Sequence, residues 1–477
     1  MDQKYIIGID GGSQSSKVVI YDLSGNVVCE GTEPLKPMHL PKPGIVEHPD
    51  DDLWDSIVVA SKKAMAAFSG NPNDIIGLGL CTIRFCRCLL KSDGTLAQPV
   101  LSWMDQRVSK PYEHDNPDVA YVTTTTGYMT HRFTGEFNDT SANYQGMWPI
   151  DTDTWQWSND PDVFSAMQIP KKMLFNLQMP GTILGYVTKT ASQSTGIPEG
   201  IPVVATGNDK AVEALGSGTL SNDTALISLG TYICGMVHGK ENPKGTQSFW
   251  TNFSNMPNEY LYESYGIRRG MWTVSWFKEL MGHELTKKSY EVGLSPEDFL
   301  NLEASQVPAG SCGLMTVLDW LAPTEAPYRK GIMIGFDGRH QRGHMYRSIL
   351  EGIALTMKNR MDEMCDELGI GINQIIISGG GSNSDLMMQI FADVFGVVAK
   401  RNKINSAASL GGAISVAVGL GIYDSYETAL HKMVTPGDSF IPIHDHLILY
   451  EKMNQDVYQK ITQFSDSILK KSYPLFN

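Results

Sequence analysis

The sequence predicts an α/β protein built from two domains. Its 477 residues are too many for a single hydrophobic core. In both halves, short apolar runs rich in β-branched residues alternate with segments whose apolar residues recur at helical spacing. A polar, glycine-containing hairpin also opens each half, as expected for two copies of one architecture. We place the boundary after residue 236, which gives domains at 1–236 and 237–477.

The first domain is predicted to begin with strands and one long helix. The helix should start at about Asp50, because Pro49 and three successive aspartates supply start signals before an apolar stripe. Strands are expected where β-branched runs are bounded by Gly, Asn and Ser. These strands are residues 5–10, 17–22, 26–31, 75–82 and 87–94.

The second domain is predicted to repeat this alternation. Residues 224–230 and 232–239 form an apolar hairpin around a Gly-Thr turn. Ser295 followed by Pro296 marks a helix start, with proline at the first helical position. Three further elements are expected: a long helix from about His344 to Leu368, a buried strand at 375–378 and a helix at 384–395.

Composition and charge exclude several classes of function. The formal net charge of −14 argues against nucleic acid as a principal partner, because phosphate backbones require a basic surface. No apolar run approaches a membrane span, and the acidic start MDQKYIIGID is unlike a signal peptide. The seven cysteines are scattered without a CxxC pair, which favours reduced thiols. We therefore expect a cytoplasmic protein without a membrane or nucleic-acid partner.

The segment DGGSQSSK, from Asp10 to Lys17, places small polar residues at the tip of a predicted hairpin. It is neither a Walker P-loop nor a GxGxxG dinucleotide fingerprint. Glycines in such a turn let backbone N–H groups approach phosphate oxygens, and hydroxyls add donors. Asp10, at the strand end, suits a Mg²⁺ ion held through water. Taken alone, the segment is also compatible with an ordinary surface hairpin.

Three further polar clusters follow predicted strands. Ser228–Tyr232 is a second hairpin turn with a glycine and a hydroxyl. Ser378–Ser384 contains three consecutive glycines before a helix, which suits a flat ligand or phosphate lying against backbone and a helix N-terminus. Val203–Lys210 ends a strand in Gly-Asn-Asp, where Asp209 is either a general base or the N-cap of the next helix.

Taken in this order, the clusters resemble the FGGY family of carbohydrate kinases, in the superfamily of actin, hexokinase and the heat-shock chaperone ATPases. DGGSQSSK resembles the first phosphate turn of that family, with Ser13 where Thr is usual. GNDKA resembles its catalytic segment, SLGT its second phosphate turn and SGGGSNSDLMMQIFAD its adenosine segment. Residues 335–354 resemble its second signature. The resemblance covers essentially the whole chain and implies two actin-like (ribonuclease H-like) ATPase domains flanking a cleft.

The resemblance implies an ATP-dependent kinase that phosphorylates a sugar or polyol hydroxyl. Asp209 would be the base that takes the hydroxyl proton, and Asp10 would help to position Mg²⁺. The family also suggests a homodimer. The residues expected to bind ATP are Gly12, Ser13, Gln14, Ser15 and Lys17 in the first turn, Gly230 and Thr231 in the second, and Gly379, Gly380, Gly381 and Ser384 around adenosine.

The substrate is harder to assign. Arg84 is shared with glycerol kinases but not with xylulose kinases, and it is expected either to bind a substrate hydroxyl or carboxylate or to tie down a loop by pairing with an acid. Asp105, in WMDQR, is a candidate hydroxyl acceptor beside Asp209. Residues 108–133 are shorter than the family pattern, and Asn405 stands near a position where the family has Glu.

Two other classes of function compete with the kinase. One is a non-catalytic, nucleotide-gated binding protein on the same scaffold, which would be favoured if Asp209 only caps a helix. The other is an NAD-dependent oxidoreductase, which the missing fingerprint and the missing acid on the next strand end make remote.

Overall fold

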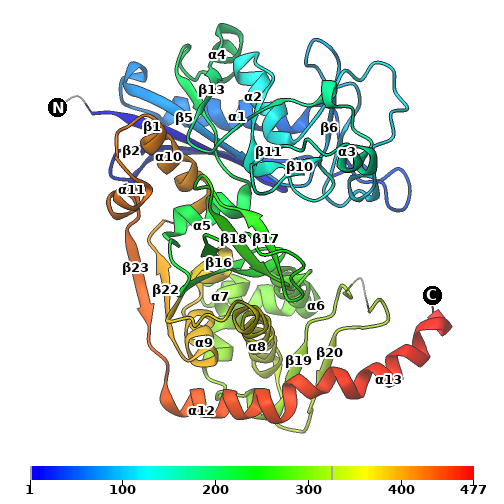
Figure 1. The fold of residues 1–477 in the computed structure, drawn as a ribbon. Coiled ribbons are helices and arrows are strands. Elements are labelled where there is room, and N and C mark those ends of the chain that lie inside the picture. Colours follow the sequence, from blue (N-terminus) through cyan, green and yellow to red (C-terminus); the bar gives the residue numbers. More distant parts are fainter. Residues whose placement is uncertain (1–2, 324–325, 405, 477) are drawn as a thin grey trace.

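The computed structural model describes residues 3–323, 326–404 and 406–476, and Asn405 therefore lies outside the described residues. The chain folds into two α/β lobes, one above the other in Figure 1. Each lobe is built on its own mixed sheet. The N-terminus lies on the upper lobe, and the last helices run along the bottom of the lower lobe.

The first lobe contains a six-stranded sheet in the order β13-β14-β5-β1-β2-β3. β1 pairs antiparallel with β2 and parallel with β5, so Asp10 lies opposite Lys17 on one side and Cys81 on the other. The polar turn between β1 and β2 therefore lies at the end of two inner strands of the sheet. The strands are β1 (Tyr5–Gly11), β2 (Ser15–Asp22), β3 (Val27–Pro34), β5 (Ile75–Thr82), β13 (Ile183–Tyr186) and β14 (Pro202–Val204).

The predicted elements of this lobe are confirmed, with small shifts at their ends. The helix expected from Asp50 is α1 (Asp52–Ala67), which buries Leu53, Trp54 and other apolar residues. The strand expected at 87–94 is only β6 (Cys88–Leu90), because residues 91–95 turn back on themselves. Smaller elements complete the lobe: β4 (Glu47–His48), β7 (Val100–Leu101), β8 (Tyr121–Thr123), α2 (Thr125–Thr134), α3 (Pro161–Met167), α4 (Lys189–Thr195) and α5 (Asp209–Ser217).

The second lobe contains a seven-stranded sheet in the order β17-β18-β16-β15-β21-β22-β23. The predicted hairpin is β15 and β16, and the predicted strand after the long helix is β21, parallel to β15. Because β15 and β21 are parallel, the polar turns that follow them lie at the same end of the sheet. The strands are β15 (Thr224–Leu229), β16 (Ile233–Gly239), β17 (Phe249–Phe253), β18 (Tyr260–Ser264), β21 (Gln374–Ser378), β22 (Val398–Asn402) and β23 (Pro436–Phe440).

Helices surround this second sheet. The long helix predicted from His344 to Leu368 is α8, which starts two residues earlier and buries Ile353, Met357 and Met361. Ser295 caps α7 as predicted, with Pro296 at its first position. The helices are α6 (Gly270–Glu291), α7 (Pro296–Ser305), α8 (Arg342–Leu368), α9 (Asp385–Phe395), α12 (His444–Met453) and α13 (Gln459–Phe476).

Late in the sequence the chain returns to the first lobe. α10 (Ala407–Gly419) packs on α5, β1 and β5, next to α11 (Tyr426–Met433) in the orange segment of Figure 1. Glycine makes this close approach possible, because a Cβ on Gly8 would lie 1.9 Å from the carbonyl oxygen of Ser409. The sequence pattern did not reveal this return.

The boundary expected after residue 236 falls inside β16. The second hairpin does open the second lobe, but it begins with β15, so a boundary after residue 236 divides the hairpin. The change from one sheet to the other lies between β14 and β15, after helix α5. A division of the chain at one position also misses α10 and α11, which belong to the first lobe by their packing.

All seven cysteines lie in the described part of the chain and are free thiols. Among the described helices, none combines the length and the apolar character needed to cross a lipid bilayer.

One buried histidine makes stability pH-dependent. Neither ring nitrogen of His48 is hydrogen-bonded within the described residues, and burial lowers its pKa from 6.5 to about 4. The imidazole is neutral in the folded protein but protonated in the unfolded chain below pH 6.5, so stability is lost as the pH falls from 6.5 towards 4. We expect wild type to lose about 2 kcal/mol of unfolding free energy between pH 7 and 5 relative to His48→Leu. Urea unfolding at both pH values tests this, and an equal pH dependence of the two proteins would contradict it.

Candidate active site

Two polar turns from different lobes meet where the lobes face each other. Gln14, in the β1–β2 turn, donates a hydrogen bond from Nε2 to Oγ1 of Thr231 in the β15–β16 turn, at 3.3 Å. These residues are 217 positions apart in the sequence. The hydroxyls of Ser13 and Ser15 make no hydrogen bond to the described residues and remain available to a ligand. The turns that were expected to hold phosphates are therefore adjacent.

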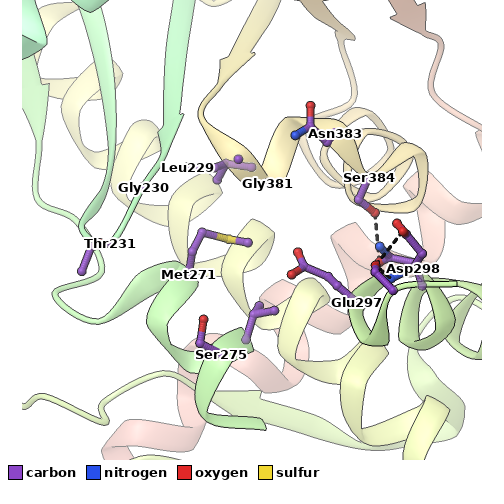
Figure 2. A pocket seen from close by; sticks show the side chains of 14 residues that line it. Leu229, Gly230, Thr231, Met271, Ser275, Glu297, Asp298, Gly381, Asn383 and Ser384 are labelled. Atoms are coloured by element: carbon purple, nitrogen blue, oxygen red, sulfur yellow. Dashed lines mark hydrogen bonds between the residues drawn. The ribbon is translucent and has the colours of Figure 1, made fainter. Parts of the chain in front are cut away.

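A cavity of about 480 Å³ continues from these turns into the second lobe (Figure 2). It lies between the β15–β16 turn, the triple-glycine turn after β21, and the first turns of α6 and α7. Figure 2 shows the side chains of Met271 and Glu297 directed into the space between these elements. The lining residues are Leu229, Gly230, Thr231, Met271, Val274, Ser275, Ser295, Glu297, Asp298, Asn301, Gly380, Gly381, Asn383 and Ser384.

The three glycines of the β21 turn differ in their surroundings. A Cβ on Gly380 would meet nothing within 4 Å, so backbone is exposed to the cavity there. Gly381 also lines the cavity, packed against Leu229 and Met271. Gly379 does not line it: φ is +84°, and a Cβ would lie 2.5 Å from the carbonyl oxygen of Leu229. Gly379 therefore packs against Leu229, and its expected contact with adenosine stays a prediction.

The far wall of the cavity, formed by α6 and α7, was not anticipated. Ser295 was interpreted only as a helix start, yet with Glu297 and Asn301 it faces the cavity. Ser384 was expected there, but its hydroxyl is engaged: it caps α9 by accepting from the N–H of Met387 and donates to Oδ1 of Asn301 at 3.0 Å. The sequence could have indicated this wall through the first turn of α7, because its polar side chains lie on one face of the helix.

Asp209 is the first residue of α5, but it is not the helix cap. Asn208 is the N-cap, and its Oδ1 accepts from the N–H groups of Lys210 and Ala211, both at 3.0 Å. The interpretation of Asp209 as only a cap is therefore not supported. Burial raises the pKa of the Asp209 carboxyl, Arg84 and Lys210 lower it in part, and Glu213 raises it further. A carboxylate with raised basicity suits proton abstraction.

Asp10, Asp209 and Glu213 lie close enough to influence one another electrostatically. The pKa of Asp10 is raised to about 7, first by burial and then by the charges of Asp209 and Glu213. Such a concentration of negative charge favours a cation. Within the described residues, no three His, Cys, Asp or Glu side chains form a ready metal cage. The arrangement fits Mg²⁺, which usually takes one or two carboxylates and completes its shell with water and phosphate oxygens.

Lys210 and Glu213 form a buried pair that sequence reasoning missed. Lys210 Nζ lies 2.9 Å from Oε2 of Glu213 and donates to Oγ of Ser228 at 2.6 Å. Glu213 also accepts hydrogen bonds from Ser228 at 3.0 Å and from Ser378. Ser228 is the last residue but one of β15 and Ser378 is the last of β21, so Glu213 connects the helix of Asp209 to both polar turns of the second lobe. The sequence could have indicated this pair, because Lys210 and Glu213 are three residues apart on a helix.

Two residues that were expected to contact a ligand are engaged by protein groups. Lys17 is directed to Glu30 at 2.8 Å and to Ser406 at 2.6 Å, so its charge is paired away from the turns. The Asp105 carboxylate is fully buried and accepts from the N–H of Val46 and from Arg107, so it is not free for a substrate hydroxyl. Both are structural anchors. Arg84 is paired with Glu263, the second of the two alternatives open for it.

Comparison with known proteins identifies the family. The N-terminal domain of the FGGY family of carbohydrate kinases matches residues 5–117 and 110–216, and the C-terminal domain matches 225–420. The chain belongs to the FGGY family of carbohydrate kinases. It is thus a phosphotransferase family member with the two-domain, actin-like ATPase fold. The two N-terminal matches overlap at residues 110–117, inside the segment 108–133 that was expected to be shorter than the family pattern.

Individual relatives agree with this assignment. The chain is 56% identical over 477 residues to a protein described as an uncharacterized sugar kinase, YgcE, of Escherichia coli (strain K12), covering all of this chain and 97% of the relative. Its fold is similar to xylulose kinase from Rhodospirillum rubrum (TM-score 0.83, 20% identity, 98% and 100% of the two chains). It is also similar to gluconate kinase from Lactobacillus acidophilus (TM-score 0.83, 18% identity, 98% and 99%).

Proposed function

We propose that the protein transfers the γ-phosphoryl group of ATP to a hydroxyl of a sugar or polyol. The observation that carries this proposal is the convergence of the two polar turns, through Gln14 and Thr231, beside the acidic group of Asp10 and Asp209. A kinase of this family needs its triphosphate held between lobes and a carboxylate opposite the terminal phosphate. The geometry supports both requirements at one place.

In this proposal the 480 Å³ cavity receives adenosine. The backbone at Gly380 and Gly381 lies against the nucleoside, and Gly230 and Thr231 lead from there to the phosphates. Ser13 and Ser15 then donate from the first lobe to phosphate oxygens, whereas the N–H of Gly12 donates to the carbonyl oxygen of Ser15 at 3.0 Å. Asp10 would hold Mg²⁺, and the bound ion would supply positive charge beside the phosphates.

Asp209 acts as the general base. The acceptor hydroxyl gives its proton to the Asp209 carboxylate, and its oxygen forms a bond to the γ-phosphorus. The bond between the γ-phosphorus and the bridging oxygen breaks, and that oxygen leaves with the electron pair as part of ADP. The raised pKa of Asp209 strengthens its affinity for the proton that it must take.

A screen for ADP release tests the proposal directly. Purified protein with MgATP should release ADP at least about 10-fold faster with one of a panel of ketoses and alditols than without acceptor, since hydrolysis by water lacks a positioned nucleophile. Mass spectrometry should detect the phosphate ester, and EDTA should abolish the reaction. ATP hydrolysis unaffected by every acceptor would favour the non-catalytic, nucleotide-gated alternative.

A further inference from the structure

A buried ion pair joins the two lobes beside Asp209. Arg84 follows β5 in the first lobe, and Glu263 lies in β18 of the second. Nη1 of Arg84 is 2.6 Å from Oε2 of Glu263, and Nη2 is 2.7 Å from Oε1. The side chains are 12% and 0% exposed. This two-pronged geometry fixes the orientation of the guanidinium group.

Glu263 keeps its charge in this setting. Burial alone would raise the pKa of Glu263, but the charge and hydrogen bonds of Arg84 outweigh it, and the pKa lies below its ordinary value. Asn252 donates a further hydrogen bond from Nδ2 to Oε2 at 2.9 Å. Both partners are therefore ionised, and the pair as a whole carries no net charge.

The pair borders the place where the acceptor hydroxyl must lie. Nε of Arg84 is 3.8 Å from Oδ1 of Asp209. Glu263 binds one N–H on each terminal nitrogen of the guanidinium group, which has five N–H donors in all, so three remain. These can donate to hydroxyl oxygens. The charge of Arg84, however, is already balanced.

The nearby cations of the first lobe are already paired. Four carboxylates (Asp10, Asp209, Glu213 and Glu263) face three cations, Arg84, Lys210 and Lys17, and Lys17 is also paired with Glu30. The other arginines between residues 3 and 216 are all engaged in the described structure: Arg87 by backbone carbonyls, Arg107 by Asp105 and Glu47, and Arg132 by Asp51. An aldonate carboxylate beside Arg84 would therefore meet a guanidinium group whose charge Glu263 already balances.

We propose that Glu263 determines specificity by holding Arg84 as a neutral pair, so that the acceptor is an uncharged sugar or polyol and an aldonate is rejected. This rests on the proposed kinase function and defines the substrate class of the same site. The fold itself does not impose the choice, because a gluconate kinase shares it. Glu263 reaches the acceptor site from the second lobe, 179 residues from Arg84.

Matched acceptors test the proposal in the wild-type protein. ADP release is measured with xylulose, xylitol and xylonate, and with glucitol and gluconate, so that each aldonate is compared with a neutral compound of the same chain length. We expect kcat/KM for the best neutral acceptor to exceed that for its aldonate by about 100-fold or more. This arm needs no variant, so a folding defect cannot obscure it.

Glu263→Gln should narrow this preference. The amide keeps the shape and one acceptor oxygen of Glu263 but leaves Arg84 with an unbalanced charge. The ratio of kcat/KM for the neutral acceptor to kcat/KM for its aldonate should therefore fall at least about 10-fold. A melting-temperature increase with xylonate, seen in the variant but not in wild type, would report the same gain without turnover. Glu259→Gln is the matched control: Glu259 pairs with His238 beside the same strand, and the preference should not change.

The outcomes separate the two proposals. Preferred turnover of an aldonate by wild type would leave the kinase intact and overturn the role of Glu263. An unchanged ratio in a folded Glu263→Gln protein would also overturn it. Absence of acceptor-dependent turnover with every neutral and acidic compound would reject the kinase function, and the specificity inference would fall with it.

Discussion

Replacing Asp209 with Asn should lower kcat for the best acceptor by about 10³-fold while MgADP affinity stays within about twofold of wild type. Asn has the shape of Asp but cannot take the hydroxyl proton. Asp209 is not the cap of α5, so the helix should remain intact. In the proposed function the nucleotide contacts come from the polar turns and the cavity, which the substitution does not alter.

Initial rates of ADP release and titration calorimetry with MgADP measure these two effects. Asp74→Asn is a suitable control, because Asp74 pairs with Lys4 at 3.0 Å in the same lobe but away from the turns. It should retain the kcat of wild type. An Asp209→Asn protein with undiminished turnover would remove Asp209 from the mechanism, and one that also loses MgADP binding would show that Asp209 acts in nucleotide binding.

Local signals predicted the parts of the site that lie in continuous segments. The β1–β2 turn, the β15–β16 turn and the triple-glycine turn each combine a strand with small polar residues. Such patterns depend on backbone conformation and can be recognised within about ten residues. The order of these turns, not any single one, indicated the family. Their meeting at Gln14 and Thr231 then follows from the fold.

Pairwise contacts between distant residues could not be predicted in the same way. The partner of Arg84 is 179 residues away, and nothing near Glu263 distinguishes it from other acidic residues. Asp105 has the chemistry of a hydroxyl acceptor, but its neighbours Val46 and Arg107 occupy it. The residue type therefore suggests candidates for the site, but the packing of the fold determines which carboxylates are free to bind a ligand.

The domain boundary failed for a related reason. A hairpin with polar residues at its tip opens each lobe, β1 and β2 in the first and β15 and β16 in the second, but the sequence pattern did not show that the lobe changes before the first strand of the second hairpin. The return of α10 to the first lobe depends on Gly8 and Gly79. Because they have no side chains, they can pack closely against Ser409 and Gly412, which lie 330 and more residues later in the chain. Glycine alone carries too little information to predict such a contact.

Replacing Glu213 with Ala should lower the free energy of unfolding by about 3–5 kcal/mol. The substitution leaves the buried ammonium group of Lys210 without its counter-charge, and it removes the acceptor of Ser228 and Ser378. Urea unfolding followed by circular dichroism measures the loss. Glu30→Ala is the matched control, because Glu30 pairs with Lys17 but is 47% exposed, so it should cost no more than about 1 kcal/mol.

A double variant separates the stability effect from the positioning effect. Lys210→Met with Glu213→Leu removes both charges, and most of the lost stability should return, because apolar side chains of similar size replace a buried ion pair well. Nucleotide binding should not return, since neither apolar side chain can accept from Ser228 and Ser378, which precede the turns at Gly230 and Gly379. The Kd for MgADP, measured by calorimetry, should stay raised about 10-fold or more, by the loss of hydrogen bonds to a charged group. Wild-type affinity in the stable double variant would contradict a positioning role for Glu213.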